Sequence, residues 1–271
     1  MTITLATTYH DANDRLHDQI AQALPSLTRL FAGIALQASA AAPPRSLDLL
    51  AHAGARIGQD DPQQPGGAAQ LGRSRRAALN LALRQQTAFL LYFDFDSMLH
   101  WVQYYPDELA AVLARIPDHD MTIIGRSQRA LDSHPHSQRE TELFVNHAFA
   151  HLTGYSWDVM RSGRGLSRRA AQAIVTECAE DSISVDVVWP LFLLQKGNFS
   201  ITDIRIEGTE FETPDRYGAE IVTAGGYAQW LRQIDADPRR WAHRLNLARM
   251  QVERMIAYAG PDTHLAASER P

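Results

Sequence analysis

Strand-like and helix-like segments alternate through the first third of the chain. The run Ile3–Tyr9 is short and β-branched, as strands usually are. Leu16, Ile20, Leu24 and Leu27 recur at intervals of three and four residues, so they share one helix face. The pattern continues with a strand at 31–37, a helix at 47–53, a weak strand at 55–58, a helix at 73–84 and a strand at 88–93. This order predicts a mostly parallel sheet with helices on both faces.

The remainder of the chain extends the same α/β pattern and then becomes helical. Helices are predicted at 106–116, 140–152 and 167–179, and strands at 121–124, 184–189 and 199–207. From Gly225 onward the pattern is helical, and Asp237-Pro238 divides it because Asp caps a helix and Pro fits its first turn. We therefore predict a Rossmann-like α/β domain over residues 1–220 and a helical appendage over residues 221–271.

Charge and composition exclude several classes of function. Lys and Arg total 26 against 31 Asp and Glu, a net charge of −5, which disfavours binding to a phosphate backbone. Cys178 is the single cysteine, so no intramolecular disulfide can form. No apolar run approaches the roughly 20 residues that span a bilayer, and residues 1–9 do not resemble a signal peptide. We expect a cytoplasmic protein with no integral membrane segment and no nucleic-acid partner.

Two carboxylates follow the apolar strand at 88–93. Asp94 and Asp96 lie one residue apart at its carboxyl end, where open α/β sheets bind their ligands. Paired carboxylates need a positive partner there, and a divalent cation that carries a diphosphate supplies one. The alternative is a pair of turn residues that cap the next helix. An Asp-x-Asp motif by itself leaves both interpretations open.

The segments around this motif resemble a known family. Gly72, a helix with small and basic residues, the apolar strand and then Asp94 and Asp96 resemble the core of GT-A glycosyltransferases, most closely the family-2-like group of nucleotide-diphospho-sugar transferases. Thr7-Thr8-Tyr9 at the end of the first strand resembles that family's first nucleotide-contacting loop. The resemblance covers about residues 1–100. Further along, the segments 163–167 and 186–189 occupy the order of an acceptor-side loop and a catalytic acidic residue.

The resemblance implies glycosyl transfer from a nucleotide-diphosphate sugar to the hydroxyl of an unidentified small-molecule or glycan acceptor. The nucleotide is expected near Thr7, Tyr9 and Asp60, with Arg73 and Arg76 facing its phosphates.

The resemblance also assigns the metal and the catalytic base. Asp94 and Asp96 are expected to hold Mg²⁺ or Mn²⁺ together with the diphosphate. Relatives often supply a late histidine to the metal, and here the acidic segment with Glu210 and Glu212 occupies that place, with Glu212 the predicted ligand and a solvated acidic turn the alternative. Asp186 is the expected base, which an inverting transfer requires to deprotonate the acceptor hydroxyl. A retaining transfer needs no such base, and the sequence allows both.

Arginines gather near the Gly-x-Gly at 163–165. The cluster comprises Arg161, Arg164, Arg168 and Arg169. Guanidinium groups bind phosphates and carboxylates through paired hydrogen bonds, so the cluster suits an anionic acceptor. A solvated helix face is the more ordinary explanation of the same pattern.

Two other functions fit parts of the sequence. The stretch 93–99 resembles the first motif of haloacid-dehalogenase-type phosphatases, in which the first aspartate is phosphorylated. Those enzymes need a later lysine, and Lys196 is the only lysine beside 25 arginines. The third possibility is an inactive GT-A-like binding or scaffold protein, with the C-terminal helices as an interaction surface, for example in a homodimer.

Overall fold

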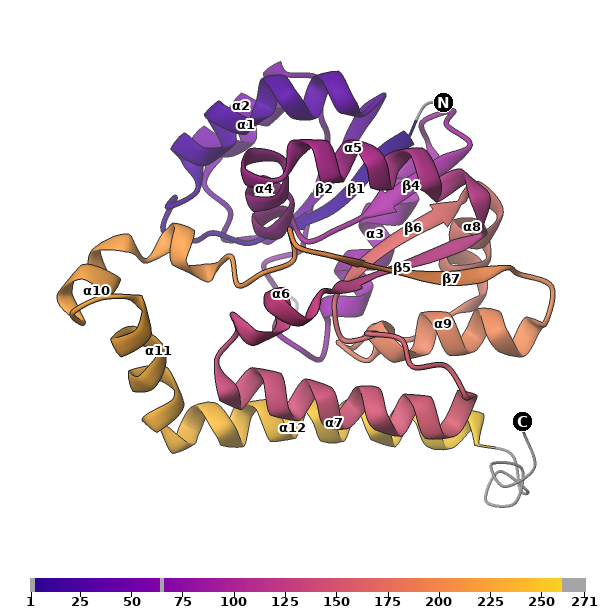
Figure 1. Ribbon diagram of the computed structural model, residues 1–271. Coiled ribbons are helices and arrows are strands. Elements are labelled where there is room, and N and C mark those ends of the chain that lie inside the picture. The colour runs from indigo at the N-terminus through magenta and orange to yellow at the C-terminus, as the bar shows by residue number, and fades with distance from the viewer. Residues whose placement is uncertain (1–2, 64–65, 260–271) are drawn as a thin grey trace.

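The computed structural model describes residues 3–63 and 66–259 of the chain, and seven strands in this part form one sheet (Figure 1). The strands are β1 (Ile3–Tyr9), β2 (Gly33–Ala38), β3 (Arg56–Gln59), β4 (Phe89–Tyr92), β5 (Met121–Arg126), β6 (Gly163–Ser167) and β7 (Ile201–Ile206). Their order across the sheet is β3-β2-β1-β4-β6-β5-β7. β6 runs antiparallel to both β4 and β5, and the other neighbouring strands are parallel. The predicted mostly parallel α/β fold is confirmed.

Helices cover both faces of the sheet and divide its core in two. One face packs against α1 (His17–Leu30), α2 (Pro44–His52), α4 (Phe95–Tyr104), α5 (Pro106–Arg115) and the short η1 (Ile116–Asp118). The other packs against α3 (Leu71–Leu83), α7 (His136–Thr153), α8 (Arg168–Glu177), α9 (Val185–Lys196) and α12 (Pro238–Met255). Neighbouring side chains of β1 point into different halves of the core, with Leu5 in the first and Ala6 in the second. Both faces are therefore closed to water, as parallel sheets require.

The segment 184–189 differs from the strand that the sequence predicted. It begins the helix α9, whose residues from Val185 to Leu191 are all buried, so its β-branched valines lie in a helix that is apolar all round. Pro190 lies inside this helix and lacks an N–H, which leaves the carbonyl of Asp186 without its helical donor. The Arg164 Nη2 atom donates to that carbonyl at 2.8 Å, so a buried arginine replaces the missing backbone hydrogen bond.

The segment 163–167 also differs from the expectation. It is not an acceptor-side loop but the interior antiparallel strand β6, paired with β4 and β5. Gly163 and Gly165 leave no room for a side chain: a Cβ would lie 2.5 Å from the Phe93 ring in one case and 2.7 Å from Ile116 in the other. The glycines that resembled a loop signal therefore serve close packing across the sheet.

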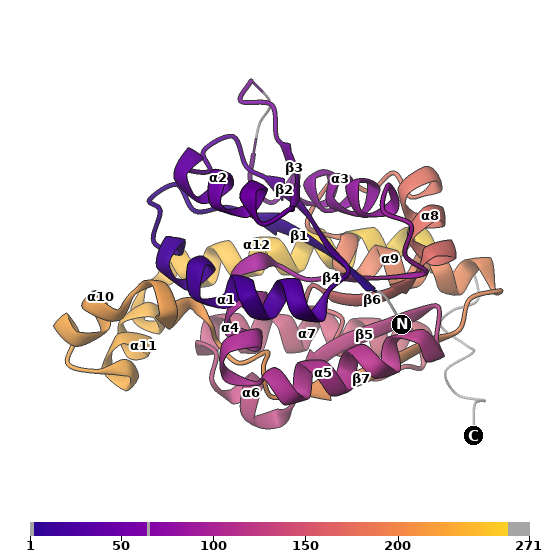
Figure 2. The same cartoon turned by 90° about the horizontal axis from the view of Figure 1, so that it is seen from above.

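The C-terminal region contains η2 (Thr213–Arg216), α10 (Gly218–Thr223), α11 (Tyr227–Ala236), α12 and η3 (Ile256–Tyr258), while the short α6 (Gln128–Asp132) follows β5. The predicted break between two helices is confirmed, because the Asp237 side chain caps α12 by accepting from the Arg239 N–H at 2.9 Å. Helix α12 lies along α7 beneath the sheet, whereas α10 and α11 project to one side (Figures 1 and 2). Residues 260–271 of the predicted appendage lie outside the described part, and its boundary stays a prediction.

None of the described helices combines the length and the apolar character needed to cross a bilayer.

Candidate functional site

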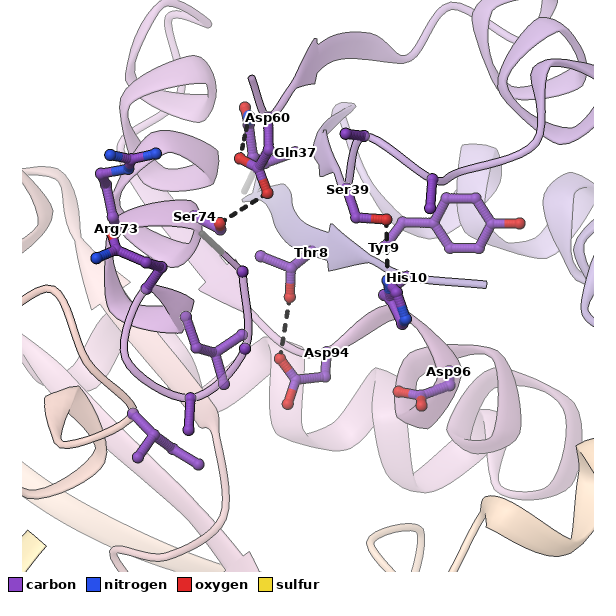
Figure 3. A pocket seen from close by; sticks show the side chains of 18 of the residues that line it. Thr8, Tyr9, His10, Gln37, Ser39, Asp60, Arg73, Ser74, Asp94 and Asp96 are labelled. Atoms are coloured by element: carbon purple, nitrogen blue, oxygen red, sulfur yellow. Dashed lines mark hydrogen bonds between the residues drawn. The ribbon is translucent and has the colours of Figure 1, made fainter. Parts of the chain in front are cut away.

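A cavity of about 740 Å³ opens at the carboxyl ends of β1 to β4. Thr8 and Tyr9 line it from β1, Gln37 from β2, Asp60 from the end of β3 and Asp94 from the end of β4 (Figure 3). Parallel strands bring their carboxyl ends to the same edge, which is why residues far apart in the sequence meet here. The volume lies within the range of cavities that bind cofactor-sized ligands.

One end of the cavity is a fixed polar wall around Asp60. Its Oδ1 atom accepts from Gln37 Nε2 at 2.9 Å, and its Oδ2 atom accepts from the Ser74 hydroxyl at 2.8 Å (Figure 3). Arg73 lines the cavity from the same helix as Ser74. Side chains from β2 and α3 thus hold the Asp60 carboxylate in place, and Arg73 lines the same cavity.

Asp94 stands at the start of α4 with both carboxylate oxygens engaged. Oδ1 accepts from the Tyr92 hydroxyl at 2.7 Å and from the Thr8 hydroxyl at 3.2 Å. Oδ2 pairs with Arg75 Nη2 at 3.1 Å. Burial favours the neutral acid, but the Arg75 guanidinium and the Tyr92 hydrogen bond outweigh it, so the pKa of Asp94 lies below its usual value. Asp94 is therefore ionised at neutral pH.

Asp96 lies in the first turn of α4 and faces the same cavity. Its Oδ1 atom accepts from the Ser97 N–H at 2.8 Å, and its Oδ2 atom pairs with Arg216 Nη2 at 2.9 Å. Burial and the nearby carboxylates of Glu212 and Asp94 raise the pKa of Asp96 above its usual value, despite Arg216. Negative charge around Asp96 is thus only partly neutralised.

Glu212 completes the set of carboxylates that the sequence predicted around a metal. It lines the cavity from the segment after β7 and pairs with Arg161 Nη2 at 3.4 Å. The structure therefore brings Asp94, Asp96 and Glu212 to one cavity, each beside an arginine.

The donor chemistry of these carboxylates suits Mg²⁺ or Mn²⁺, which prefer hard oxygen ligands. Five carboxylates and three arginines among the described residues line the cavity, so the lining carries a formal charge of −2. No group of three or more His, Cys, Asp or Glu in residues 3–63 and 66–259 is arranged to hold a metal ion as it stands. The residues thus fit a divalent cation in chemistry and charge, provided that an arginine gives up its place.

Asp186 lies behind the cavity, on the first turn of α9. Arg75 bridges the two sites, because its Nη1 atom is 2.6 Å from Asp186 Oδ1 while its Nη2 atom binds Asp94. Burial raises the pKa of Asp186 above its usual value in spite of Arg75 and Arg164. A second cavity of about 210 Å³ is lined by Asp186 and Asp94 together with Arg161. The two cavities therefore meet at Asp94 and Arg161.

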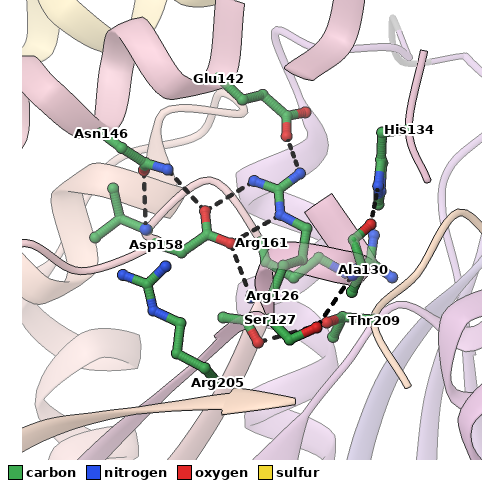
Figure 4. A network of polar contacts seen from close by, with 12 residues as sticks. Arg126, Ser127, Ala130, His134, Glu142, Asn146, Asp158, Arg161, Arg205 and Thr209 are labelled. Carbon is green, nitrogen blue, oxygen red and sulfur yellow. Dashed lines mark hydrogen bonds and ion pairs between the residues drawn. The ribbon is translucent and has the colours of Figure 1, made fainter. Parts of the chain in front are cut away.

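A buried network fixes the segment that carries Arg161 (Figure 4). Arg126 donates from Nε and Nη2 to the two carboxylate oxygens of Asp158, at 2.7 and 2.8 Å, and also pairs with Glu142. Asn146 donates to Asp158 at 2.8 Å. Burial opposes ionisation of Asp158, but the Arg126 charge prevails and holds its pKa well below the usual value. The bidentate pair anchors the chain three residues before Arg161.

Two predicted site residues lie outside the cavity. The Thr7 side chain is fully buried within the sheet and does not line it. Arg76 points away, where it pairs with Asp181 and donates to the Glu180 carbonyl. Tyr9, Asp60, Arg73, Asp94, Asp96 and Glu212 do line the cavity.

Lys196, which the phosphatase alternative would need, lies at the far end of α9 and pairs with Glu177 at 2.7 Å. It lines neither cavity, so the structure gives that alternative no support.

Arg75 and Arg216 contact the predicted site residues but are not among those predicted from the sequence. Arg75 carried a signal, because it falls on the buried stripe of α3 with Gly72, Ala78 and Leu79. A charged residue on the apolar face of a helix needs a buried partner. Arg216 carried no such signal, since its partner Asp96 lies far away in the sequence.

The strand order and the helices on both faces of the sheet match the GT-A α/β fold. No protein-family model matches the sequence, and no curated protein matches it either.

Among solved structures, the chain is similar to glucosyl-3-phosphoglycerate synthase from Mycobacterium tuberculosis. The complex of that enzyme with Mg²⁺ and uridine diphosphate gives a TM-score of 0.50 at 13% identity, over 76% of this chain and 69% of that one. Its complex with phosphoglyceric acid gives 0.50 at 14% identity, over 76% and 70%. A third structure gives 0.50 at 13% identity, over 84% and 80%. At these identities the likeness shows the fold.

Proposed function

We propose that this protein is a glycosyltransferase that moves a sugar from a nucleotide-diphosphate donor to an acceptor hydroxyl, with Mg²⁺ or Mn²⁺ as cofactor. The observation that carries the proposal is the meeting of Asp94, Asp96 and Glu212 in one cavity at the carboxyl ends of the parallel strands. The similar synthase binds Mg²⁺ and uridine diphosphate, which supports the same ligand class here.

The larger cavity would bind the donor along its length. The nucleoside would lie against Tyr9 and the Asp60 wall, with Arg73 near the phosphates. Asp94, Asp96 and Glu212 would hold the cation at the diphosphate. A bound divalent cation would act as a Lewis acid that neutralises charge on the departing diphosphate.

The smaller cavity would bind the acceptor. Its position beside Asp94 and Arg161 puts an acceptor next to the donor cavity, and Asp186 lines it. A carboxylate whose pKa is raised by burial is a stronger base, which suits removal of the hydroxyl proton. We assign Asp186 this role for an inverting transfer. Arg75 would hold Asp186 in position relative to Asp94.

The first experiment is a thermal-shift screen with UDP, GDP, CDP and dTDP, each with Mn²⁺ and with EDTA. A ligand at 100 times its Kd stabilises the fold by about 2.7 kcal/mol. One nucleotide should raise the unfolding temperature with Mn²⁺, and EDTA should remove the effect.

Asp96→Asn should abolish the shift, whereas Asp48→Asn, an exposed site on α2, should retain it. Absence of a shift with every nucleotide would overturn the donor site. Release of nucleotide from the matching sugar donor, with a panel of hydroxyl acceptors, then tests transfer directly.

A further inference from the structure

Arg216 forms an ion pair with Asp96, one of the carboxylates proposed to hold the cation. Asp96 Oδ1 already accepts from the Ser97 N–H, and Oδ2 is 2.9 Å from Arg216 Nη2. A metal ion bound to Oδ2 and a guanidinium on the same oxygen would repel each other at short range. A cation bound at Oδ2 would therefore compete with Arg216 for that oxygen.

Charge around the pair favours the exchange. With Arg216 counted, the lining of the cavity still carries a formal charge of −2. Asp94 and Glu212 line the cavity with Asp96. A divalent cation would neutralise this excess, which a single guanidinium does not.

Arg216 itself is incompletely bonded. Its Nε atom is buried and makes no hydrogen bond within the described part of the chain. A planar guanidinium presents a fork of donors that matches the oxygens of a phosphate group. Arg216 lines the same cavity, so its side chain remains beside any diphosphate bound there.

The segment that carries Arg216 is held by polar and aromatic contacts rather than by apolar core residues. The elements η2, α10 and α11 contribute no buried residue to the core, and α10 and α11 project from the body of the molecule (Figure 1). Asp215 of η2 pairs with the buried His100 at 2.9 Å. The Arg15–Glu220 ion pair at 2.8 Å and the stacking of Tyr217 on Trp230 hold the helices that follow. Segments with few buried apolar contacts rearrange at low free-energy cost.

We propose that Arg216 is a built-in counter-ion of Asp96 that a divalent cation displaces, and that the released guanidinium then binds the diphosphate of the donor. This role rests on the proposed function. It adds a binding residue for the diphosphate and couples the cation to the segment from η2 to α11.

The first test measures Mn²⁺ binding in the absence of nucleotide. Arg216→Met removes the competitor, so its affinity for Mn²⁺ should rise about fivefold or more over the wild type. Arg73→Met is the matched control, because Arg73 also lines the cavity but forms no ion pair with Asp96. Its loss of charge should change Mn²⁺ affinity much less.

The second test measures binding of inorganic pyrophosphate at saturating Mg²⁺. Arg216→Met should bind it about fivefold or more weakly, while Arg216→Lys keeps the charge and should lose less. Opposite changes for cation and pyrophosphate are the signature of the exchange, since a residue with a purely structural role would weaken both.

The third readout is fluorescence. Mg²⁺ alone should change the emission of Trp230, which stacks on Tyr217 next to Arg216, and Trp230→Phe should lack that change.

Mn²⁺ affinity that is unchanged in Arg216→Met, equally raised in Arg73→Met, or undetectable in every variant would overturn the role of Arg216. The nucleotide screen would still test the donor site separately, because it measures each nucleotide both with Mn²⁺ and with EDTA. Failure of this inference is therefore distinguishable from failure of the proposed function.

Discussion

The Arg75 Nη1 atom lies 2.6 Å from Asp186 Oδ1, although 111 positions separate the two residues in the sequence. The other terminal nitrogen of Arg75 binds Asp94. One guanidinium thus fixes the spacing between the carboxylate proposed for the donor and the carboxylate proposed for the acceptor.

Replacement of Arg75 by Met should destabilise the protein strongly. Removing one partner of a buried ion pair leaves uncompensated charge and costs about 3–5 kcal/mol in the free energy of unfolding. Urea denaturation measures the change. Arg73→Met, on the same helix but without these buried partners, should cost less than about 1 kcal/mol. Equal midpoints for the two variants would contradict the bridging role.

Asp186→Asn should separate binding from transfer. The amide keeps an oxygen that can accept from Arg75 but has no basicity, so transfer should fall by about 10²–10⁴-fold while nucleotide affinity stays the same. Steady-state assays and calorimetric titration measure the two quantities. Asp181→Asn, at the Arg76 pair outside the cavity, is the control. A fully active Asp186→Asn protein would remove this residue as the base.

Gly72→Ala should loosen the contact between α3 and the segment before α9. A Cβ at Gly72 would lie 2.4 Å from the backbone oxygen of Ser182, so the backbone must shift. Such overpacking costs about 1–3 kcal/mol. Gly218→Ala, where no atom lies within 4 Å of the added Cβ, should be nearly neutral. Chemical denaturation of both variants distinguishes a steric effect from a general effect of alanine.

Stability should depend on pH through His100. This ring bridges Asp215 at 2.9 Å and Glu210 at 3.1 Å. Burial opposes its charge, but the two carboxylates prevail and raise the pKa of His100 above its usual value of about 6.5. The charged ring therefore stabilises the fold fully below about pH 6.5, and this contribution is lost as the pH rises through the raised pKa.

Comparison with His100→Gln isolates this contribution. The excess unfolding free energy of the wild type over the variant should be larger at about pH 5.5 than at about pH 9. An excess that grows with pH would show that the ring is held neutral instead.

Local patterns predicted most strands and helices correctly, because the spacing of apolar residues indicates each element and Pro or Gly residues mark its ends. The helix at Val185–Lys196 was mistaken for a strand because β-branched residues favour strands unless packing on all sides decides otherwise. The interior position of β6 depends on pairing with β4 and β5, which no local pattern encodes.

The predictable site residues are those that come shortly after the end of a strand. Asp60 and Asp94 lie at the ends of β3 and β4, and both line the cavity. The ion pairs of Arg75 and Arg216 depend on segments that meet only in the folded chain. Thr7 illustrates the remaining difficulty. Successive side chains of a strand point in opposite directions, and here the Thr8 side chain lines the cavity while the Thr7 side chain is buried.

The position of β6 has a consequence for synthesis on the ribosome. Strands β1 to β4 can pair among themselves as soon as they emerge, but β5 pairs only with β6 and β7. A nascent chain that ends before residue 163 therefore has β5 without a partner and β4 with an open edge, the state in which unpaired strands are most exposed to aggregation. The part of the larger cavity that β1 to β4 line can be assembled first, whereas Glu212 of that cavity and Asp186 of the smaller one are added only when the last third of the chain has been made.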